Sequence, residues 1–251
     1  GTFAGWGIGY DDCRKVKQDI VYLSVSGWGQ FGPESQRPGY DPGALAHSGW
    51  MALNGEKDGP PSKAPTFLAD DLSGLHGALA VLAALRHRDA TGEGQHVDVS
   101  LLDSIIYQSN GYLTLGATGD SLERGGSEAR VCAPTNCYEC RDGHVFMALI
   151  LDSHWVRLTE VLGRSELGKD PRYLTNEDRV AHRTEVDSLV ADWCRDRPKD
   201  EVVSAIDAAG IVIAAVNTFA DAAQDPHVLE RDLLQNTTLI DGSSAPLTGP
   251  A

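Results

Sequence analysis

The stretch Ala69-Asp70-Asp71-Leu72-Ser73-Gly74-Leu75-His76-Gly77 opens the most helix-like segment of the chain. After it, leucine, valine and small alanine residues continue as far as residue 85, and the run ends at Arg86-His87-Arg88. Acidic residues at the start of a helix and basic residues at its end are favoured by the helix dipole. The pattern therefore predicts a buried helix over residues 71–88, with two adjacent carboxylates at its mouth.

These two carboxylates have an ordinary and a functional interpretation. Asp70 or Asp71 could simply be the N-cap of the helix, which is a common role for aspartate. A carboxylate held at a helix N-terminus also stays ionised and can be aimed, which suits a nucleophile better than a general acid. Ser73 and Gly74 leave room in the first turn for a second group to approach.

Length and composition limit the class of protein. The chain has 251 residues, of which 41% are hydrophobic and 23% charged, as in ordinary soluble proteins. Its 21 basic and 36 acidic residues give a net charge of −15, which argues against nucleic acid or an anionic membrane as the partner. The sequence shows no evident membrane span or signal-peptide pattern, so we expect a cytoplasmic protein.

The cysteines do not form a disulfide framework, because their number is five and two of them lie far from the rest. Cys132, Cys137, Cys140 and His144 have the spacing C-x4-C-x2-C-x3-H, which superficially suggests zinc. No second cysteine pair follows, and the later cysteines lie on a predicted strand that enters a turn. We therefore expect small buried thiols and no metal.

Residues 20–26 are rich in β-branched and aromatic side chains and predict a buried strand. The next residues, Gly27-Trp28-Gly29-Gln30-Phe31-Gly32, match G-x-G-x-x-G. A dinucleotide fingerprint must open a helix, and here Pro33 and polar residues follow at once, so we exclude a nicotinamide or flavin site. A glycine-rich crossover beside a ligand remains, since such backbone can approach a substrate closely.

The order of elements predicts an α/β fold with parallel pairing, followed by a small α+β domain. In the first part we expect helices over 44–53, 71–88 and 101–115, and strands over 20–26 and 96–100. In the second part we expect a hairpin over 136–150, helices over 154–162, 179–194 and 199–209, and a strand over 211–216. The predicted domains are a large domain over 1–120, a linker over 121–130, a small domain over 131–225 and a loop-like return linker over 226–251.

Several motifs occur together in one order along about 230 residues. They include Tyr22-Leu23-Ser24-Val25-Ser26-Gly27-Trp28-Gly29, Arg37-Pro38-Gly39-Tyr40-Asp41, residues 70–74 and residues 91–103, and further on residues 170–173, 209–211 and 225–229, with Asn176, Arg179 and Arg183. In this combination the chain resembles the class III CoA-transferase family (CaiB/BaiF type, formyl-CoA transferase-like).

The resemblance implies a Rossmann-like large domain, a smaller domain and a dimer of interlocked chains. It implies a catalytic aspartate in the pattern Asp-x-x-x-Gly, which Asp70 and Gly74 match. The implied reaction moves coenzyme A from an acyl-CoA to a carboxylic acid through an aspartyl anhydride and an aspartyl-CoA thioester, with no tightly bound cofactor. Backbone donors at the helix start and in the glycine-rich crossover are natural stabilisers of the oxyanions.

The resemblance also implies a substrate pocket around the nucleophile. Tyr40 and Asp41 match positions that line this pocket, and Arg37 is a candidate contact for the nucleotide part of CoA. The crossover residues Gly27, Trp28 and Gly29 complete the expected pocket.

Two alternatives stay open. α-Methylacyl-CoA racemases share the fold and have histidine where this chain has Tyr40, and because tyrosine is a poor proton shuttle at neutral pH, the transferase is favoured. The chain also corresponds to a member truncated at both ends, so a catalytically silent binding or dimerisation module is the other alternative. An incomplete parallel sheet exposes a strand edge, so we expect a homodimer or higher oligomer.

Overall fold

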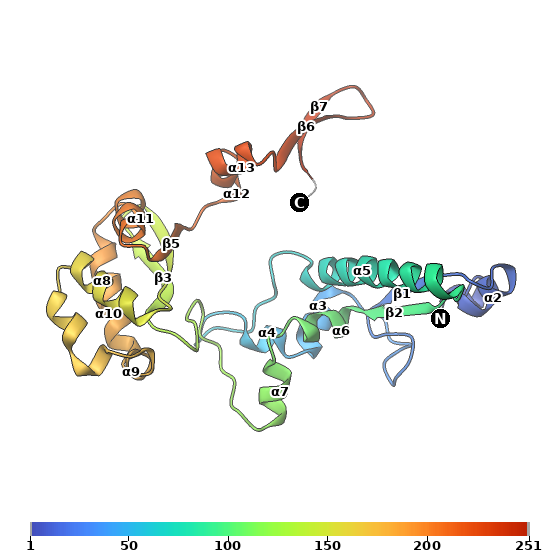
Figure 1. The fold of residues 1–251 in the computed structure, drawn as a ribbon, viewed down its shortest axis with the longest axis horizontal. Coiled ribbons are helices and arrows are strands. Elements are labelled where there is room, and N and C mark those ends of the chain that lie inside the picture. Colours follow the sequence, from blue (N-terminus) through green and yellow to red (C-terminus); the bar gives the residue numbers. More distant parts are fainter. Residues whose placement is uncertain (1, 250–251) are drawn as a thin grey trace. The chain divides into compact units, whose positions relative to one another are not determined.

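The computed structural model describes residues 2–249, and the chain divides into two compact units, Gly1–Gly126 and Ser127–Ala251 (Figure 1). The division falls inside the segment 121–130 that the sequence suggests as a linker. Both units mix helices with small sheets, so the fold is of the expected α/β and α+β type.

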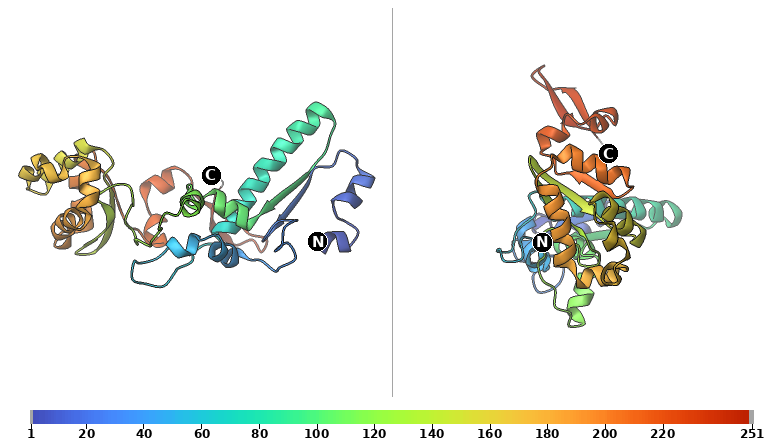
Figure 2. Two further views of the ribbon diagram at one scale, coloured as in Figure 1. Left: turned by 90° about the horizontal axis from the view of Figure 1, so that it is seen from below. Right: turned by 90° about the vertical axis from the view of Figure 1, so that its left-hand side faces the viewer.

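The first unit is built around two parallel strands. Strands β1 (Tyr22–Ser26) and β2 (His96–Ser100) pair in register from Tyr22 with His96 to Ser26 with Ser100. The long helix α5 (Leu68–Thr91) comes directly before β2 in the sequence and packs along both strands (Figure 2). The shorter helices are α1 (Thr2–Gly5), α2 (Tyr10–Val16), α3 (Asp41–His47), α4 (Trp50–Leu53), α6 (Leu101–Tyr107) and α7 (Tyr112–Ala117).

Two predicted helices are each divided by a residue with positive φ. The segment 44–53 forms α3 and α4, which are separated at Gly49 with φ of 87°. The segment 101–115 forms α6 and α7, which are separated at Asn110 and Gly111 with φ of 49° and 80°. A continuous helix cannot pass through this left-handed region, so the expectation of single helices was wrong at both places.

Helix α5 is only partly buried within its unit, so the prediction of a buried helix needs correction. Its small residues Ala69, Ser73, Gly77 and Ala84 are buried, whereas Leu75, Leu79 and Leu82 are 63–65% exposed. The buried face consists of small residues because the helix packs closely on β1: a Cβ on Gly77 would lie 3.1 Å from Leu23 Cδ2. By length and composition α5 is also apolar enough to cross a membrane, contrary to the expectation from the sequence, although one such helix is weak evidence for a membrane span.

The second unit has an antiparallel sheet of order β3-β4-β5, formed by β3 (Thr135–Cys140), β4 (Gly143–Ala148) and β5 (Val212–Ala215). Its helices are α8 (Asp152–Val161), α9 (Asn176–Ala181), α10 (Arg183–Arg195) and α11 (Lys199–Ala208), with short 3-10 turns at Ser165–Lys169 and Pro171–Tyr173. The core includes Trp155, Met147, Val145, Leu158 and Ile206, all at most 1% exposed.

A buried arginine organises the loops of the second unit. Arg179 is 0% exposed and donates to the carbonyl oxygens of Ala133, Tyr173 and Leu174, and its other nitrogen lies 2.8 Å from Asp152 Oδ1. A buried guanidinium is stable only when its donors are paired in this way.

The C-terminal segment carries more structure than the predicted return linker over 226–251. After α12 (Phe219–Ala222), its described residues form α13 (Pro226–Glu230) and a hairpin of β6 (Leu234–Thr238) and β7 (Ser244–Thr248). Asp225 caps α13 by accepting from the N–H groups of His227 and Val228, which explains why Asp225-Pro226 starts a helix.

Candidate functional site

The first turn of α5 lies at the carboxyl end of the two parallel strands. The Ser73 hydroxyl donates to Ala69 O at 2.6 Å and lies 3.4 Å from the carbonyl oxygen of Ser100, the last residue of β2. The start of α5, with Asp70, is thereby fixed next to this edge of the sheet. In open α/β sheets, ligands bind at this edge.

The glycine-rich crossover and the turn over residues 37–41 pack against each other at the same edge. A Cβ on Gly27 would lie 2.7 Å from the Cα of Gly39, so the two backbones touch. Trp28 Nε1–H donates to Pro38 O at 3.2 Å, and the Arg37 guanidinium lies 5.2 Å from the Trp28 ring centroid. The structure therefore brings together the crossover residues and the turn that the sequence assigned to one pocket.

The remaining side chains of this predicted pocket differ in exposure. Arg37 is exposed and pairs with Glu34 at 3.0 Å, and Tyr40, the N-cap residue of α3, is 79% exposed. Asp41, the next residue, is only 2% exposed. The exposed side chains of Arg37 and Tyr40 are accessible to a ligand, whereas Asp41 is buried between α3 and the start of α5.

Two backbone donors of the crossover are already engaged. Gly29 N–H donates to Ser26 Oγ at 3.1 Å, and Gln30 N–H donates to Asp98 Oδ2 at 2.9 Å. The expectation that the crossover amides face an oxyanion is therefore wrong for these two groups. Sequence reasoning missed Asp98, although the alternation of His96, Asp98 and Ser100 along the strand placed them on one face.

The start of α5 is capped from outside the helix. Its N-cap residue, Phe67, provides no side-chain hydrogen bond, and Asp70 and Asp71 lie inside the first turn. Instead, Asp41 Oδ2 accepts from the N–H of Ala69 at 2.7 Å. The expectation that Asp70 or Asp71 is the N-cap is therefore replaced by a cap contributed from α3.

Asp70 is exposed, and its environment disfavours the charged form. Partial burial, the charge of Asp41 and the charge of Asp71, in that order, raise the pKa of Asp70 above its usual value. A Cβ built on Gly74, one turn further along α5, would meet nothing within 4 Å. Asp70 is thus a carboxylate that a bulky group can reach, held near other negative charges.

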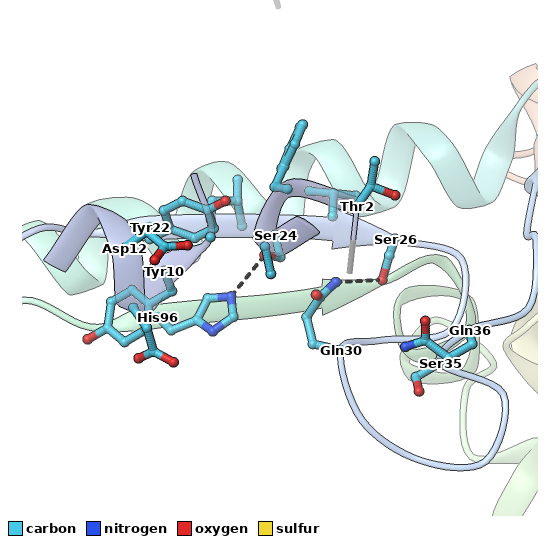
Figure 3. A pocket seen from close by; sticks show the side chains of 16 residues that line it. Thr2, Tyr10, Asp12, Tyr22, Ser24, Ser26, Gln30, Ser35, Gln36 and His96 are labelled. Atoms are coloured by element: carbon cyan, nitrogen blue, oxygen red, sulfur yellow. Dashed lines mark hydrogen bonds between the residues drawn. The ribbon is translucent and has the colours of Figure 1, made fainter. Parts of the chain in front are cut away.

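A cavity of about 800 Å³ with a mixed polar and apolar lining lies elsewhere in the first unit, along β1 (Figure 3). Ser24 Oγ and His96 Nε2 are 2.8 Å apart in it, and Gln30 Nε2 donates to Ser26 Oγ at 3.3 Å. Asp70 is not among the residues that line this cavity. The carboxylate chemistry is therefore assigned to the start of α5 and not to this cavity.

The five cysteines are present as thiols, and two of them are buried. Cys140 and Cys194 are buried in the core of the second unit, where burial raises the pKa of the Cys194 thiol to about 12. Cys132 Sγ lies 3.3 Å from Thr135 Oγ1. Among residues 2–249, no group of three His, Cys, Asp or Glu side chains is arranged to hold a metal ion.

Comparison with known proteins gives a consistent result. A family model described as CoA-transferase family III matches residues 1–250. The chain is 35% identical over 245 residues to the "Succinyl-CoA--L-malate CoA-transferase beta subunit" of Chloroflexus aurantiacus, covering 96% of this chain and 60% of the relative. It is 31% identical to the "Succinate--glutarate CoA-transferase" of Agrobacterium fabrum, covering 97% of this chain and 61% of the relative.

Among solved structures, a CAIB/BAIF family protein from Brucella suis matches with a TM-score of 0.80 and 28% identity. The match covers 100% of this chain and 70% of that protein. The chain spans about three fifths of the length of the curated relatives named above, 60% and 61%.

Proposed function

The chain belongs to CoA-transferase family III, and we propose that it acts in the transfer of coenzyme A from an acyl-CoA donor to a carboxylic acid. The observation that carries the proposal is the exposed Asp70 carboxylate in the first turn of α5, with open space at Gly74. A nucleophile for a bulky thioester needs both the exposed oxygen and the room beside it.

The first half of the reaction breaks the donor thioester. A carboxylate oxygen of Asp70 attacks the thioester carbonyl, the carbon–sulfur bond breaks, and CoA leaves as its thiolate. The thiolate then attacks the Asp70 carbonyl carbon of the mixed anhydride and displaces the donor acid as a carboxylate. Asp70 is left as an aspartyl-CoA thioester.

The second half repeats these steps in reverse with the acceptor. The acceptor carboxylate attacks the aspartyl-CoA carbonyl carbon, the carbon–sulfur bond breaks and the CoA thiolate leaves. The acceptor and Asp70 are then joined in a second mixed anhydride. The thiolate attacks the acceptor acyl carbon, the carbon–oxygen bond to Asp70 breaks, and the Asp70 carboxylate is restored. Each bond that forms is matched by one that breaks, and no net proton is transferred.

This balance explains which side chains the site requires. A carboxylate is both the attacking group and the leaving group, so the reaction needs no histidine to carry a proton. It does need donors for the oxyanion that each attack creates. We assign this task to groups other than the amides of Gly29 and Gln30, because these already donate to Ser26 and Asp98.

The substrate pocket is proposed to include the crossover and the adjoining turn. The exposed Arg37, which lies over Trp28, supplies a cation for the phosphates of CoA, and the exposed Tyr40 lies beside the buried Asp41. Malate and glutarate, named for the relatives, are the first acceptor acids to try. We propose a homodimer or higher oligomer as the working assembly.

The test is intact mass spectrometry after incubation with a panel of acyl-CoAs and hydroxylamine. An aspartyl-CoA adduct or a hydroxamate at Asp70 is expected, and it should be absent in Asp70→Ala. The matched control is Asp71→Asn, which removes the neighbouring carboxylate and should keep the adduct. Absence of any adduct from every donor, with retained fold, would overturn the proposal.

The same acyl-CoA incubations, repeated in heavy water, separate the transferase from the racemase and from the silent module. Deuterium uptake from heavy water at the carbon next to the thioester carbonyl, without an adduct on Asp70, would point to a racemase. Absence of both CoA binding and adduct would point to a silent binding or dimerisation module.

A further inference from the structure

We infer that Asp41 is a positioning residue that aims Asp70 and whose negative charge favours the acylated form of Asp70 over the free carboxylate. The inference rests on the proposed function, because it concerns how the nucleophile of that reaction is prepared. It assigns two separable roles to one side chain, a hydrogen bond and a charge.

The positioning role follows from the hydrogen bond between α3 and α5. Asp41 Oδ2 accepts from the N–H of Ala69, the residue directly before Asp70, at 2.7 Å. Ala69 itself is 0% exposed, so the backbone at this point is held by packing as well. Because Phe67 provides no cap, this contact fixes where the first turn of α5 begins and therefore where Asp70 points.

The cap at Ala69 uses only one of the two carboxylate oxygens of Asp41, and it does not explain why the other is buried. Asp41 Oδ1 is buried and has no hydrogen-bond partner among the described residues. A cap alone needs one acceptor, which an asparagine or serine would supply without an extra buried charge. A buried carboxylate oxygen with no donor is costly unless it has another use.

The effect of the Asp41 charge on Asp70 gives the buried carboxylate of Asp41 a second role. Partial burial is the largest cause of the raised pKa of Asp70, the charge of Asp41 on α3 comes next, and Asp71 on α5 itself adds a smaller effect. The other elements packed on α5 carry further titratable groups, which are Asp103 and Tyr107 on α6, His96 and Asp98 on β2, Tyr22 on β1 and His47 on α3. Asp41 and Asp71 are the charged groups to which the raised pKa of Asp70 is attributed. Asp41 is thus the strongest charged neighbour of Asp70.

Like charge next to the nucleophile favours the proposed chemistry in two ways. Asp70 is negative as a free carboxylate and neutral as an anhydride or thioester, so acylation removes the repulsion from Asp41. A carboxylate with a raised pKa is also more basic and a better nucleophile. Both effects speed the attack on the thioester.

The substitution Asp41→Asn separates the charge from the hydrogen bond. Its amide oxygen can still accept from the N–H of Ala69, whereas the negative charge is lost. The control Asp71→Asn removes a carboxylate that is exposed and has the smaller effect on Asp70. Asp41→Ala removes both roles and should also lower the thermal stability of the first unit.

The experiment measures the titration of Asp70 by carbon-13 NMR of aspartate carboxyl groups, with the signal assigned from its loss in Asp70→Asn. We expect the midpoint of Asp70 to fall in Asp41→Asn, and to fall further than in Asp71→Asn. The initial rate of hydroxamate formation from acyl-CoA should fall roughly tenfold in Asp41→Asn. An unchanged midpoint in folded Asp41→Asn would overturn the inference.

A second measurement covers the case in which Asp41→Asn does not fold. In the unmodified chain, the titration midpoint of Asp70 should lie above the ordinary value of aspartate, because partial burial and the charges of Asp41 and Asp71 raise its pKa. A midpoint at or below the ordinary value would count against the inference. If no adduct forms in the unmodified chain, the proposed function fails, while these titrations still decide whether Asp41 acts on Asp70.

Discussion

At the scale of single residues, the candidate nucleophile is held in an unfavourable electrostatic environment. Burial, Asp41 and Asp71 all act against the charged form of Asp70. Groups held in this way are found at functional sites more often than elsewhere, since the same arrangement weakens the folded state and is not kept for stability.

This environment predicts a pH-dependent effect of Asp70→Asn on stability. Because the folded-state pKa of Asp70 is raised, its contribution to stability is fully present below the ordinary value of about 3.9 and is lost as the pH rises through the raised value. Asparagine does not titrate, so the Tm of Asp70→Asn relative to the unmodified chain should be higher at about pH 7 than at about pH 3. Scanning calorimetry at both pH values measures this difference.

Asp71→Asn serves as the comparison, because it removes a neighbouring carboxylate that has the smallest of the three effects on the pKa of Asp70. A Tm difference for Asp70→Asn that is the same at both pH values would contradict the prediction. The variant should also fail to form the hydroxamate, which ties the gain in stability to the loss of the nucleophile.

The sequence placed Asp70 correctly at the start of a helix but did not predict what holds it there. The two carboxylates, the following apolar run and the glycine four residues later are all local signals. The cap from Asp41 comes from 28 residues away and depends on how α3 packs on α5, which no local pattern encodes. The engaged amides of Gly29 and Gln30 were missed for the same reason, because their acceptor Asp98 is on another strand.

At the scale of elements, periodicity located most of the longer helices and strands. The errors concern where helices stop and which short elements the predicted loops contain, such as α13, β6 and β7. The hairpin of β3 and β4 and the helices α8 and α11 lie within a few residues of the predicted spans. The long helices predicted over 101–115 and 179–194 are instead divided, the first at Gly111 and the second at His182. A helical pattern of apolar residues continues across such breaks, so the pattern alone cannot show them.

Two substitutions at Gly74, in the second turn of α5, should have opposite effects on adduct formation. A Cβ at Gly74 meets open space, so Gly74→Ala should stabilise the helix by about 0.5–1 kcal/mol and keep adduct formation. Gly74→Trp should also fold, but its side chain lies one turn from Asp70 on the same face and should block the acyl-CoA. Thermal unfolding and the hydroxamate assay give the two readouts.

Ala78→Trp is the matched control, because it adds the same side chain to the same helix one turn further from Asp70. It should leave the rate of hydroxamate formation close to that of the unmodified chain. Equal loss of activity in both tryptophan variants would mean that the space at Gly74 is not the path to the nucleophile.

At the scale of the whole molecule, each unit has its own buried residues, but they differ in how much apolar surface they cover. Among residues 2–249, the core of the second unit has 16 buried residues, including Trp155 and Met147, whereas the core of the first unit has six, including Leu45 and Ile105. The first unit therefore depends on further contacts to cover its apolar side chains.

The uncovered face of α5 predicts self-association. Leu75, Leu79 and Leu82 lie on one face of the helix and are 63%, 65% and 63% exposed. Covering each of them would contribute about 1.5–3 kcal/mol, which is enough to drive association of two copies. Size-exclusion chromatography with light scattering should therefore show a dimer or larger species at micromolar concentration.

The double variant Leu75→Glu/Leu79→Glu should shift this assembly towards the monomer, because two charges would have to be buried at the contact. Val131→Glu is the matched control, since Val131 is 78% exposed in the second unit and lies outside this face. A monomer for the unmodified chain would contradict the prediction outright. An oligomer that survives the double glutamate variant would place the contact elsewhere, and the exposed leucines of α5 would then need a different explanation.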